Sequence, residues 1–451
     1  MNLYRLLQKR AESNTPVTVG LIGGGKFGSM FLAQARLTTG LQIVAISDLR
    51  PDNARQNLAA AGWQPEQFAA TSISDALRSG GTYVGDDAAA MIVAGGIEVI
   101  VDATGDPSAG IRHALLCIEN GKHIVMVNVE ADALAGPLLA RRAEEAGVIY
   151  SLAYGDQPAL ICEQVDWARA TGFKVVSAGK GTRYLADFHQ TTPDNVFSNY
   201  FVSAEIAERG NLNPKMCTSF LDGTKSAIEM TAVCNSTGLT PQPGGLNFPP
   251  VSCYELADQL KPKSDGGTLS HAGTTEVISC LNRDGTDVEH HLQMGVYVVV
   301  EADNEYVSHC FEEYNLLHDK TAKYSAMYRP THLIGLELGI SVASIALRGE
   351  ATGSPSGFRS DVVATAKRDL KAGEILDGEG GYCVWGKQMP AVDSVSMGAL
   401  PLGLAHDVTL KNPVKTGGQV RWTDVDIDQT LEAVQFRRQM EQAFSQAEAA
   451  E

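Results

Sequence analysis

Short apolar runs alternate with segments of helical periodicity along the first third of the chain. The runs end in small or polar residues, and apolar side chains recur three or four positions apart in the segments between them. Strands separated by helices in this way form a parallel sheet with helices on both faces. The sequence therefore predicts an α/β doubly wound domain over residues 1–155, with strands at 17–22, 42–47, 97–103, 123–127 and 148–152. The polar stretch 59–96 is interpreted as an insertion between the second and third strands.

The pattern changes after Gly155. Long apolar runs at 173–178, 277–281 and 293–301 predict strands of a mixed sheet, and segments 157–170, 224–234 and 312–328 predict helices. We assign residues 156–357 to an α+β substrate domain on this basis. Gly-punctuated short runs predict a small β-rich module at 358–430, and residues 431–451 predict a closing polar helix.

The charge balance excludes some classes of function. The 451 residues carry 36 Lys and Arg against 53 Asp and Glu, a formal charge of −17, which disfavours binding to a nucleic-acid backbone. No apolar run reaches the ~20 residues that span a bilayer, and residues 1–10 form an amphipathic segment that lacks the features of a secretory signal. Eight scattered cysteines in no metal-ligand spacing favour reduced thiols. We expect a cytoplasmic protein without a nucleic-acid or membrane partner.

A glycine-rich segment follows the first predicted strand. Gly23, Gly25 and Gly28 form a G-x-G-x-x-G pattern that also contains Lys26 and Phe27, between a strand and a helix. In such a turn the first glycine allows the tight bend, the second lets the backbone approach a pyrophosphate, and the third lets helix and strand pack closely. The helix N-terminus adds free N–H groups for the anion. The segment predicts a dinucleotide site in a Rossmann domain.

The residues after the second strand bear on the choice of dinucleotide. Asp48 lies 20 residues after Gly28, where a carboxylate accepts from the ribose 2′-hydroxyl of NAD. Arg50, two residues later, has the charge to hold the 2′-phosphate of NADP. These residues alone leave both cofactors open. Further cofactor contacts are expected at Thr104, Gly105 and Asn128, because they follow later strands at the same sheet edge.

Hydride transfer to or from a carbonyl needs a nearby cation or acid, and three segments of the middle domain supply candidates. The first holds Lys180 and Arg183 beside glycines. The second holds Asp222, Lys225 and Glu229, the last two one helical turn apart. The third holds His318, Lys320, Lys323 and Arg329. We predict Lys180, Asp222, Lys225 and Glu229 as catalytic residues and the other five as ligands of a small anionic substrate. No dedicated metal site is evident, but Asp222 and Glu229 are candidates to share a divalent ion such as Mg²⁺ or Mn²⁺.

The order of the motifs resembles a known group of enzymes over nearly the whole chain. The segments GLIGGGKFG, VDATG, VNVEAD, AYGDQP, GKGTRY and DGTKSAIEM resemble homoserine dehydrogenase and, more closely, the second, atypical class of 1-deoxy-D-xylulose 5-phosphate reductoisomerase. The segments VVATAKRDLKAGEIL, LPLGLAHDVTL and GGQV look like a SAF domain, a β-clip module. One departure concerns Asn128-Val129-Glu130, where homoserine dehydrogenases carry a catalytic lysine in an A-N-K pattern.

The resemblance implies a reductoisomerase of isoprenoid precursor synthesis. Such an enzyme rearranges 1-deoxy-D-xylulose 5-phosphate and reduces the product with NADPH to 2-C-methyl-D-erythritol 4-phosphate. It also implies that residues 156–357 form the catalytic and dimerisation domain of a homo-oligomer, a dimer or tetramer. A preference for NADP(H) over NAD(H) through Arg50 and a catalytic cation at Lys225 or Lys180 are further implications. Two alternatives stay open: an NAD(P)-dependent oxidoreductase related to homoserine dehydrogenase that acts on another small hydroxy acid, sugar acid or amino acid, and a nucleotide-binding regulator without turnover.

Overall fold

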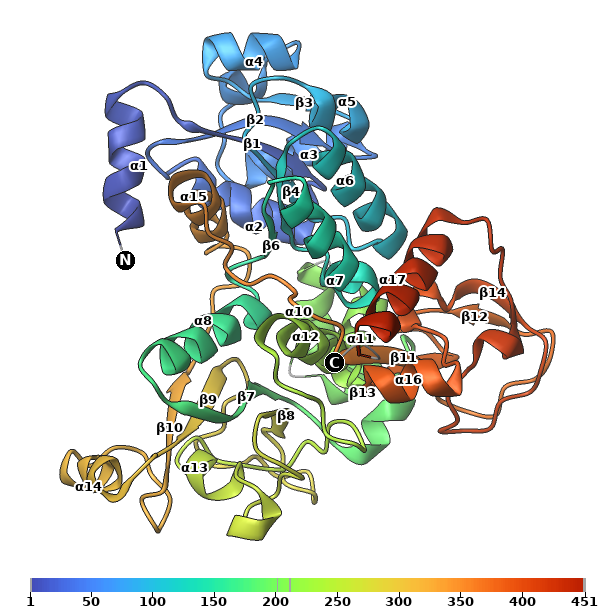
Figure 1. Cartoon of the computed structure of the whole chain (residues 1–451). Coiled ribbons are helices and arrows are strands. Elements are labelled where there is room, and N and C mark those ends of the chain that lie inside the picture. The colour runs from blue at the N-terminus through green and yellow to red at the C-terminus, as the bar shows by residue number, and fades with distance from the viewer. Residues whose placement is uncertain (1, 201, 211, 449–451) are drawn as a thin grey trace. The chain divides into compact units, whose positions relative to one another are not determined.

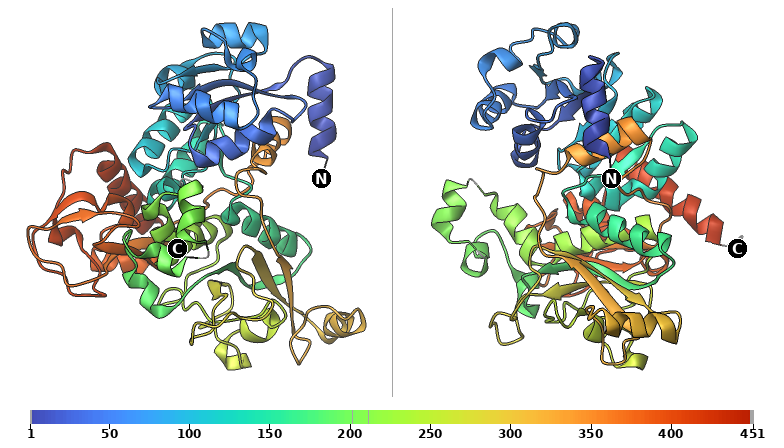
Figure 2. Two further views of the ribbon diagram at one scale, coloured as in Figure 1. Left: turned by 180° about the vertical axis from the view of Figure 1, so that it is seen from behind. Right: turned by 90° about the vertical axis from the view of Figure 1, so that its left-hand side faces the viewer.

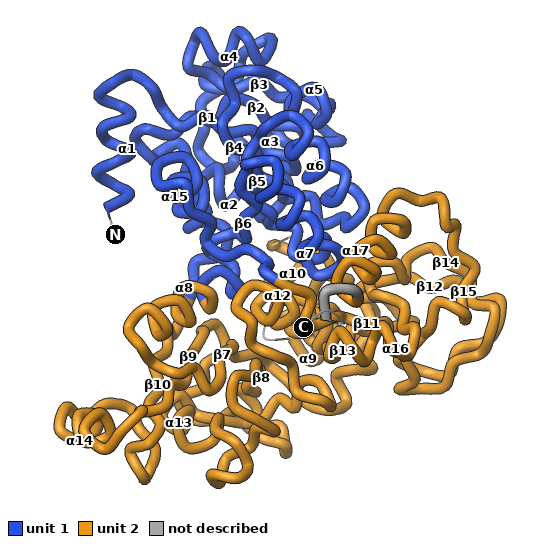
Figure 3. The backbone as a smooth tube through the Cα atoms, in the orientation of Figure 1, with its two compact units in different colours: residues 1–160, 332–356 blue, residues 161–331, 357–451 orange. Residues whose placement is uncertain are grey.

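A computed structural model of the chain describes residues 2–200, 202–210 and 212–448. The chain divides into two compact units, residues 1–160 with 332–356 and residues 161–331 with 357–451 (Figure 3). The sequence-based division did not anticipate that residues 332–356 return to the first unit. They bring helix α15 (Gly339–Arg348), whose Val342 and Ile345 are buried in the same core as the first strand.

The first unit is built on a six-stranded parallel sheet, which confirms the predicted doubly wound fold. The strand order is β3-β2-β1-β4-β5-β6, and helices cover both faces (Figures 1 and 2). This order places the glycine-rich turn after β1 at the centre of the carboxyl edge, where dinucleotides bind. The strands are β1 (Val17–Ile22), β2 (Leu41–Ser47), β3 (Tyr83–Gly85), β4 (Val99–Asp102), β5 (His123–Met126) and β6 (Tyr150–Leu152). The helices are α1 (Leu3–Glu12), α2 (Lys26–Ala35), α3 (Pro51–Ala60), α4 (Ile73–Ser79), α5 (Ala88–Val93), α6 (Pro107–Glu119) and α7 (Val129–Glu145).

The stretch 59–96 is part of the sheet architecture rather than a plain insertion. It contains α4, α5 and the short strand β3, whose Tyr83 pairs in parallel with Ala45 of β2. Three residues are too few to show a period, so the hydrophobic pattern alone could not identify this strand.

The second unit contains a mixed four-stranded sheet in the order β10-β9-β7-β8. β7 (Lys174–Thr182) runs parallel to β8 (Thr274–Ser279) and antiparallel to β9 (Val296–Glu301), which pairs antiparallel with β10 (Tyr324–Arg329). The helix predicted over 312–328 is wrong: α14 (Glu305–Glu313) ends early and β10 follows. The remaining helices here are α8 (Gln157–Ala170), α9 (Val196–Asn199), α10 (Ala204–Arg209), α11 (Pro214–Leu221), α12 (Thr224–Thr237) and α13 (Leu256–Gln259).

The segment after residue 357 belongs to the same compact unit as that sheet. Its two small antiparallel sheets pair β11 with β13, and β14 with both β12 and β15. The bounds are β11 (Ser360–Ala366), β12 (Ile375–Asp377), β13 (Val384–Pro390), α16 (Ala391–Met397), β14 (His406–Leu410), β15 (Val425–Asp426) and α17 (Glu432–Glu448). No helix among residues 2–200, 202–210 and 212–448 combines the length and apolarity needed to cross a membrane.

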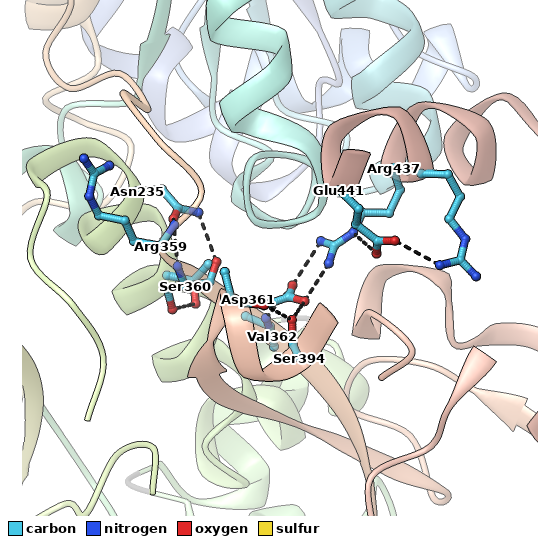
Figure 4. A network of polar contacts seen from close by, with 11 residues as sticks. Asn235, Arg359, Ser360, Asp361, Val362, Ser394, Arg437 and Glu441 are labelled. Atoms are coloured by element: carbon cyan, nitrogen blue, oxygen red, sulfur yellow. Dashed lines mark hydrogen bonds and ion pairs between the residues drawn. The ribbon is translucent and has the colours of Figure 1, made fainter. Parts of the chain in front are cut away.

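A buried ion network fixes α17 to this segment (Figure 4). Arg437 is fully buried and donates to both carboxylate oxygens of Asp361 on β11, at 3.0 and 2.6 Å, and to Glu441 at 2.9 Å. The hydroxyl of Ser394 also donates to Asp361, at 2.6 Å. Because a buried charge is tolerated only when it is paired, these contacts make the closing helix an integral part of the unit.

Candidate active site

The glycine-rich turn is held rigidly by side chains of its own unit. The carboxylate of Asp48 accepts the N–H of Gly24 through Oδ2 at 2.8 Å and the N–H of Arg50 through Oδ1 at 2.8 Å. The side-chain amide of Asn57 donates to the carbonyl of Gly24 at 2.8 Å. The backbone of Gly24 is therefore tied down on both sides, which prepares the turn before any ligand binds.

Two glycines of this turn have different surroundings. A Cβ at Gly28 would lie 2.3 Å from the carbonyl oxygen of Gly23, so only glycine lets the helix pack there. A Cβ at Gly25 would meet no atom within 4 Å. Gly25 is also the N-cap of α2, which has no side-chain cap. The uncapped N–H groups and the open space fit the pyrophosphate of a dinucleotide, with Lys26 exposed beside them and Phe27 half-buried.

The expected contacts after β4 and β5 form one polar network. The hydroxyl and N–H of Thr104 donate to Asp102 at 2.7 and 2.9 Å, and Asn128 donates to Thr104 at 3.1 Å. The carboxylate of Asp102 also contacts the imidazole of His113 at 2.7 Å, a partner that the sequence did not reveal. Gly105 follows with φ at +74°. These side chains shape the sheet edge, and their contact with a cofactor stays a prediction.

A fully buried carboxylate lies in the first turn of α7. Asp132 accepts the hydroxyl of Tyr150 at 2.9 Å, and its second oxygen has no hydrogen-bond partner. Burial raises the pKa of Asp132 to about 7, against a usual value of 3.8. The folded state therefore holds this carboxyl in its protonated form over a pH range where the unfolded chain releases the proton.

Replacing Asp132 by asparagine is expected to remove a pH dependence of stability. The pKa is raised on folding, so this carboxyl stabilises the fold below pH ~4 and the contribution is lost as the pH rises toward ~7, by up to about 4 kcal/mol. Asparagine keeps an acceptor for Tyr150 and cannot ionise. Urea unfolding at pH 5 and pH 8 should show wild type losing stability across this range and Asp132→Asn losing less. Parallel curves for the two proteins would contradict the assignment.

The second unit contains a buried ion pair between two of the predicted motifs. Lys180 on β7 donates to the carboxylate of Glu229 on α12, and the exposed fractions of the two side chains are 3% and 1%. A buried ammonium and carboxylate in contact provide a proton donor and an acceptor shielded from bulk water. The sequence identified both residues but placed Glu229 with Lys225 rather than with Lys180.

The other two predicted catalytic residues lie at the start of α12. Lys225 is half-buried in its first turn. Asp222 is fully buried, accepts the N–H of Thr224 at 2.9 Å and contacts the ammonium of Lys367 at 2.8 Å. Burial raises the pKa of Asp222, and Lys367 opposes that effect. The contact of Lys367 with Asp222 could not be predicted from the sequence, because the two residues lie far apart along the chain.

The suggestion that Asp222 and Glu229 share a divalent ion does not fit this geometry. Each carboxylate contacts a different buried ammonium group, on Lys367 and Lys180. Within the ranges that the structure describes, no group of three or more His, Cys, Asp or Glu side chains is placed to hold a metal ion. The carboxylates are balanced by lysines of the chain itself.

The predicted anion-binding residues do not form one cluster. Lys323 contacts Asp265 at 2.7 Å and Glu301 at 3.2 Å, and Glu301 is paired in register with Lys174 at the start of β7. Lys180 lies six residues further along that strand, a separation of ~20 Å. Lys320 is exposed just before Lys323, and the imidazole of His318 contacts the carbonyl of Asp319. The third predicted segment is therefore split, and its lysines lie at the far end of the sheet.

Arg329 and Arg183 lie at the same end of the sheet as Lys180. Arg329 and Lys180 are both in register with Val296 on the strand between them, so their side chains leave the same face of the sheet. Arg183 follows the end of β7, donates to the carbonyl of Asn199 at 3.0 Å and lies 3.9 Å from Asp287. Lys180, Arg183 and Arg329 are the part of the predicted anion set that the sheet places at one end.

Comparison with known proteins gives the class of the chain. It is an oxidoreductase, and its first unit has the parallel sheet of a Rossmann fold. Residues 155–338 match the family model described as "Oxidoreductase DRL, catalytic domain". This range contains both motifs that form the Lys180–Glu229 pair. No curated protein matches the chain significantly.

Solved structures share only parts of the fold. Biliverdin reductase from Synechocystis sp. PCC 6803, solved with biliverdin and NADP⁺, is 18% identical, with 38% of this chain and 48% of that chain covered at a TM-score of 0.27. A myo-inositol dehydrogenase from Corynebacterium glutamicum ATCC 13032 is 11% identical, with 40% and 48% covered at 0.28. The chain thus spans about half of the length of these two structures. A structure from Magnetospirillum magnetotacticum MS-1 is 15% identical, with 76% and 95% covered at 0.37. Sequence identities and TM-scores this low give no information about the substrate of this chain.

Proposed function

We propose that the chain is an NADP(H)-dependent oxidoreductase that interconverts a hydroxyl and a carbonyl group on a small anionic compound, such as a hydroxy acid or sugar acid. The observation that carries this proposal is the buried contact of Lys180 with Glu229. It joins the two motifs richest in candidate acid and base groups, inside the range that matches an oxidoreductase catalytic domain.

In this proposal Lys180 manages the charge and the proton of the substrate oxygen. NADP(H), when bound, supplies or accepts the hydride. The ammonium of Lys180 donates a hydrogen bond to the substrate oxygen, stabilises the negative charge that develops there during reduction, and delivers the proton. Glu229 accepts a hydrogen bond from this ammonium and so orients it, and Lys180 regains the proton that it has delivered from water when the product leaves. Lys225, one helical turn before Glu229, and Arg329, on the sheet face of Lys180, bind the anionic group of the substrate.

The preference for NADP(H) is proposed to reside in Arg50. Both carboxylate oxygens of Asp48 already accept backbone N–H groups, whereas the side chain of Arg50 is exposed. Arg50→Ala is expected to weaken NADPH binding by ~10-fold or more and to leave NADH binding nearly unchanged, since only NADPH carries the 2′-phosphate. Arg78→Ala, which removes an exposed arginine of the same unit, is the control. Titration by nicotinamide fluorescence measures the affinity for each cofactor. An equal loss of affinity for NADPH and NADH would exclude this role of Arg50.

A reductoisomerase of 1-deoxy-D-xylulose 5-phosphate is the second candidate. The motifs GKGTRY and DGTKSAIEM, which are similar to that class, supply the contacting pair Lys180 and Glu229. The predicted phosphate ligands Lys320 and Lys323 lie at the other end of the sheet, which leaves Lys180, Arg183 and Arg329 for a phosphate. This incomplete clamp is the reason to place a simple oxidoreductase first.

A substrate panel separates the two functions. Purified protein is mixed with NADPH and 1-deoxy-D-xylulose 5-phosphate, with and without Mg²⁺, and in parallel with NADP⁺ or NAD⁺ and a set of hydroxy acids, sugar acids and amino acids. The absorbance of reduced nicotinamide reports turnover. Turnover of an acid alone supports the first proposal, and turnover of the phosphorylated ketose supports the second. Tight NADPH binding with no turnover of either kind would favour a nucleotide-binding regulator.

A further inference from the structure

The junction between α11 and α12 is held by residues from the end of the chain. α12 begins after Gly223, whose φ is +91°, and has no side-chain cap at its N-terminus. The hydroxyl of Thr224 accepts the N–H of Gly386 on β13 at 2.7 Å. The carboxylate of Asp222 contacts the ammonium of Lys367, just after β11, at 2.8 Å. Two groups of the segment after residue 357 thus contact the junction, one at the last residue before Gly223 and one at the first residue of the helix that carries Glu229.

Lys367 is unusually constrained for a lysine. The exposed fraction of its side chain is 2%, and its ammonium donates to the carbonyls of Thr191 at 2.6 Å and Gly381 at 2.8 Å in addition to contacting Asp222. Three oxygens from three separate segments therefore surround one buried charge. Such a group has a single favourable position, because any displacement would leave a buried charge unsatisfied.

The same junction is also linked to the motif that contains Lys180. The Nδ1 atom of His189 lies 2.6 Å from the carbonyl of Asp222, so this nitrogen carries the hydrogen and Nε2 accepts from the hydroxyl of Tyr184 at 2.9 Å. Burial lowers the pKa of His189, which keeps the imidazole neutral in this arrangement. Its ring stacks on Trp385 of β13 with centroids 3.8 Å apart. Tyr184 belongs to the turn after β7, so the junction connects both halves of the ion pair.

We propose that Lys367 is a positioning residue that fixes the start of α12 and thereby the placement of Glu229 against Lys180. The inference rests on the proposed role of that pair in catalysis. Glu229 lies five residues after Thr224, about 7.5 Å along the helix axis, so a shift or rotation of the first turn is passed directly to its carboxylate. Displacements near 1 Å are enough to slow a reaction that depends on aligned groups.

The test compares two ways of removing the buried charge. Lys367→Met leaves the carboxylate of Asp222 without its ammonium and is expected to lower the melting temperature. Lys367→Met/Asp222→Asn removes both charges and is expected to recover most of that loss, because a neutral amide can still accept the N–H of Thr224. Lys415→Met is the matched control, since Lys415 lies in the same segment with 87% of its side chain exposed.

The readout does not require a known substrate. Acetic anhydride labelling, followed by mass spectrometry, measures how fast the amine of Lys180 reacts as a function of pH. In the double variant, a loosened contact with Glu229 is expected to raise this rate at least ~5-fold. The kcat with the substrate found in the panel should fall ~10- to 100-fold, with KM and the NADPH affinity within ~2-fold of wild type. Lys415→Met should change none of these quantities.

A double variant that melts like wild type and shows wild-type labelling of Lys180 would overturn the inference. Lys367 would then only neutralise the buried charge of Asp222. Should the double variant fold poorly, Thr224→Val removes the acceptor of Gly386 without touching a charge and is expected to raise the labelling rate in the same direction. Wild-type turnover in Lys180→Met would instead contradict the proposed function, so the two failures are distinguishable.

Discussion

Replacing Lys180 by methionine is expected to lower kcat by ~10³-fold or more, which corresponds to about 4 kcal/mol of transition-state stabilisation. Methionine fills a similar volume but provides neither a charge nor a proton. Lys180 is buried on β7 in contact with Glu229, so bulk water cannot easily take over its role. NADPH binding should persist, because the glycine-rich turn lies in the other compact unit. Steady-state kinetics and an NADPH titration measure the two effects separately.

The control for Lys180→Met must account for stability. Removing the lysine leaves the carboxylate of Glu229 buried without this partner, a change that costs about 3–5 kcal/mol in such pairs. Lys180→Met/Glu229→Gln removes both charges and is expected to melt closer to wild type while remaining inactive. A double variant with substantial turnover would show that the pair stabilises the fold rather than carrying protons.

Most of the nucleotide-binding fold could be predicted from the sequence, because its signals are local. The apolar runs and the G-x-G-x-x-G pattern each lie within one strand–turn–helix, and the parallel order follows from the helices between the strands. Strand β3 was not predicted, because three residues are too few to show a hydrophobic period. Strand β10 was not predicted, because it is an edge strand with Met327 exposed and it follows charged residues that suggested a helix.

The candidate catalytic centre was predictable only in part, for a physical reason. Lys180 and Glu229 could be named because each lies in a motif dense in charge. Which groups meet depends on contacts between distant segments, and those have no local signal. Asp222 contacts Lys367, and Glu229 contacts Lys180 on β7, and in both pairs the two residues lie far apart in the sequence. A charge pattern along one helix cannot show that a residue of a distant strand also contacts that helix.

Replacing Gly25 by alanine is expected to weaken NADPH binding by ~100-fold while the melting temperature stays near that of wild type. The added methyl group meets no protein atom within 4 Å, so the fold has room for it. That space is where the backbone is expected to approach the pyrophosphate, so the methyl group should displace the ligand from the N–H groups of α2. Fluorescence titration with NADPH and a thermal melt measure the two quantities.

Substitutions of two other glycines in the same unit serve as controls for Gly25→Ala. Gly28→Ala is expected to lower the melting temperature as well as the affinity, because its methyl group would lie 2.3 Å from the carbonyl oxygen of Gly23. Gly95→Ala, at another position without a neighbour within 4 Å, should change neither quantity. If Gly25→Ala bound NADPH like Gly95→Ala, the pyrophosphate would not lie over this turn. The cofactor assignment would then have to rest on a different part of the sheet edge, because close backbone approach is the physical reason for requiring glycine at residue 25.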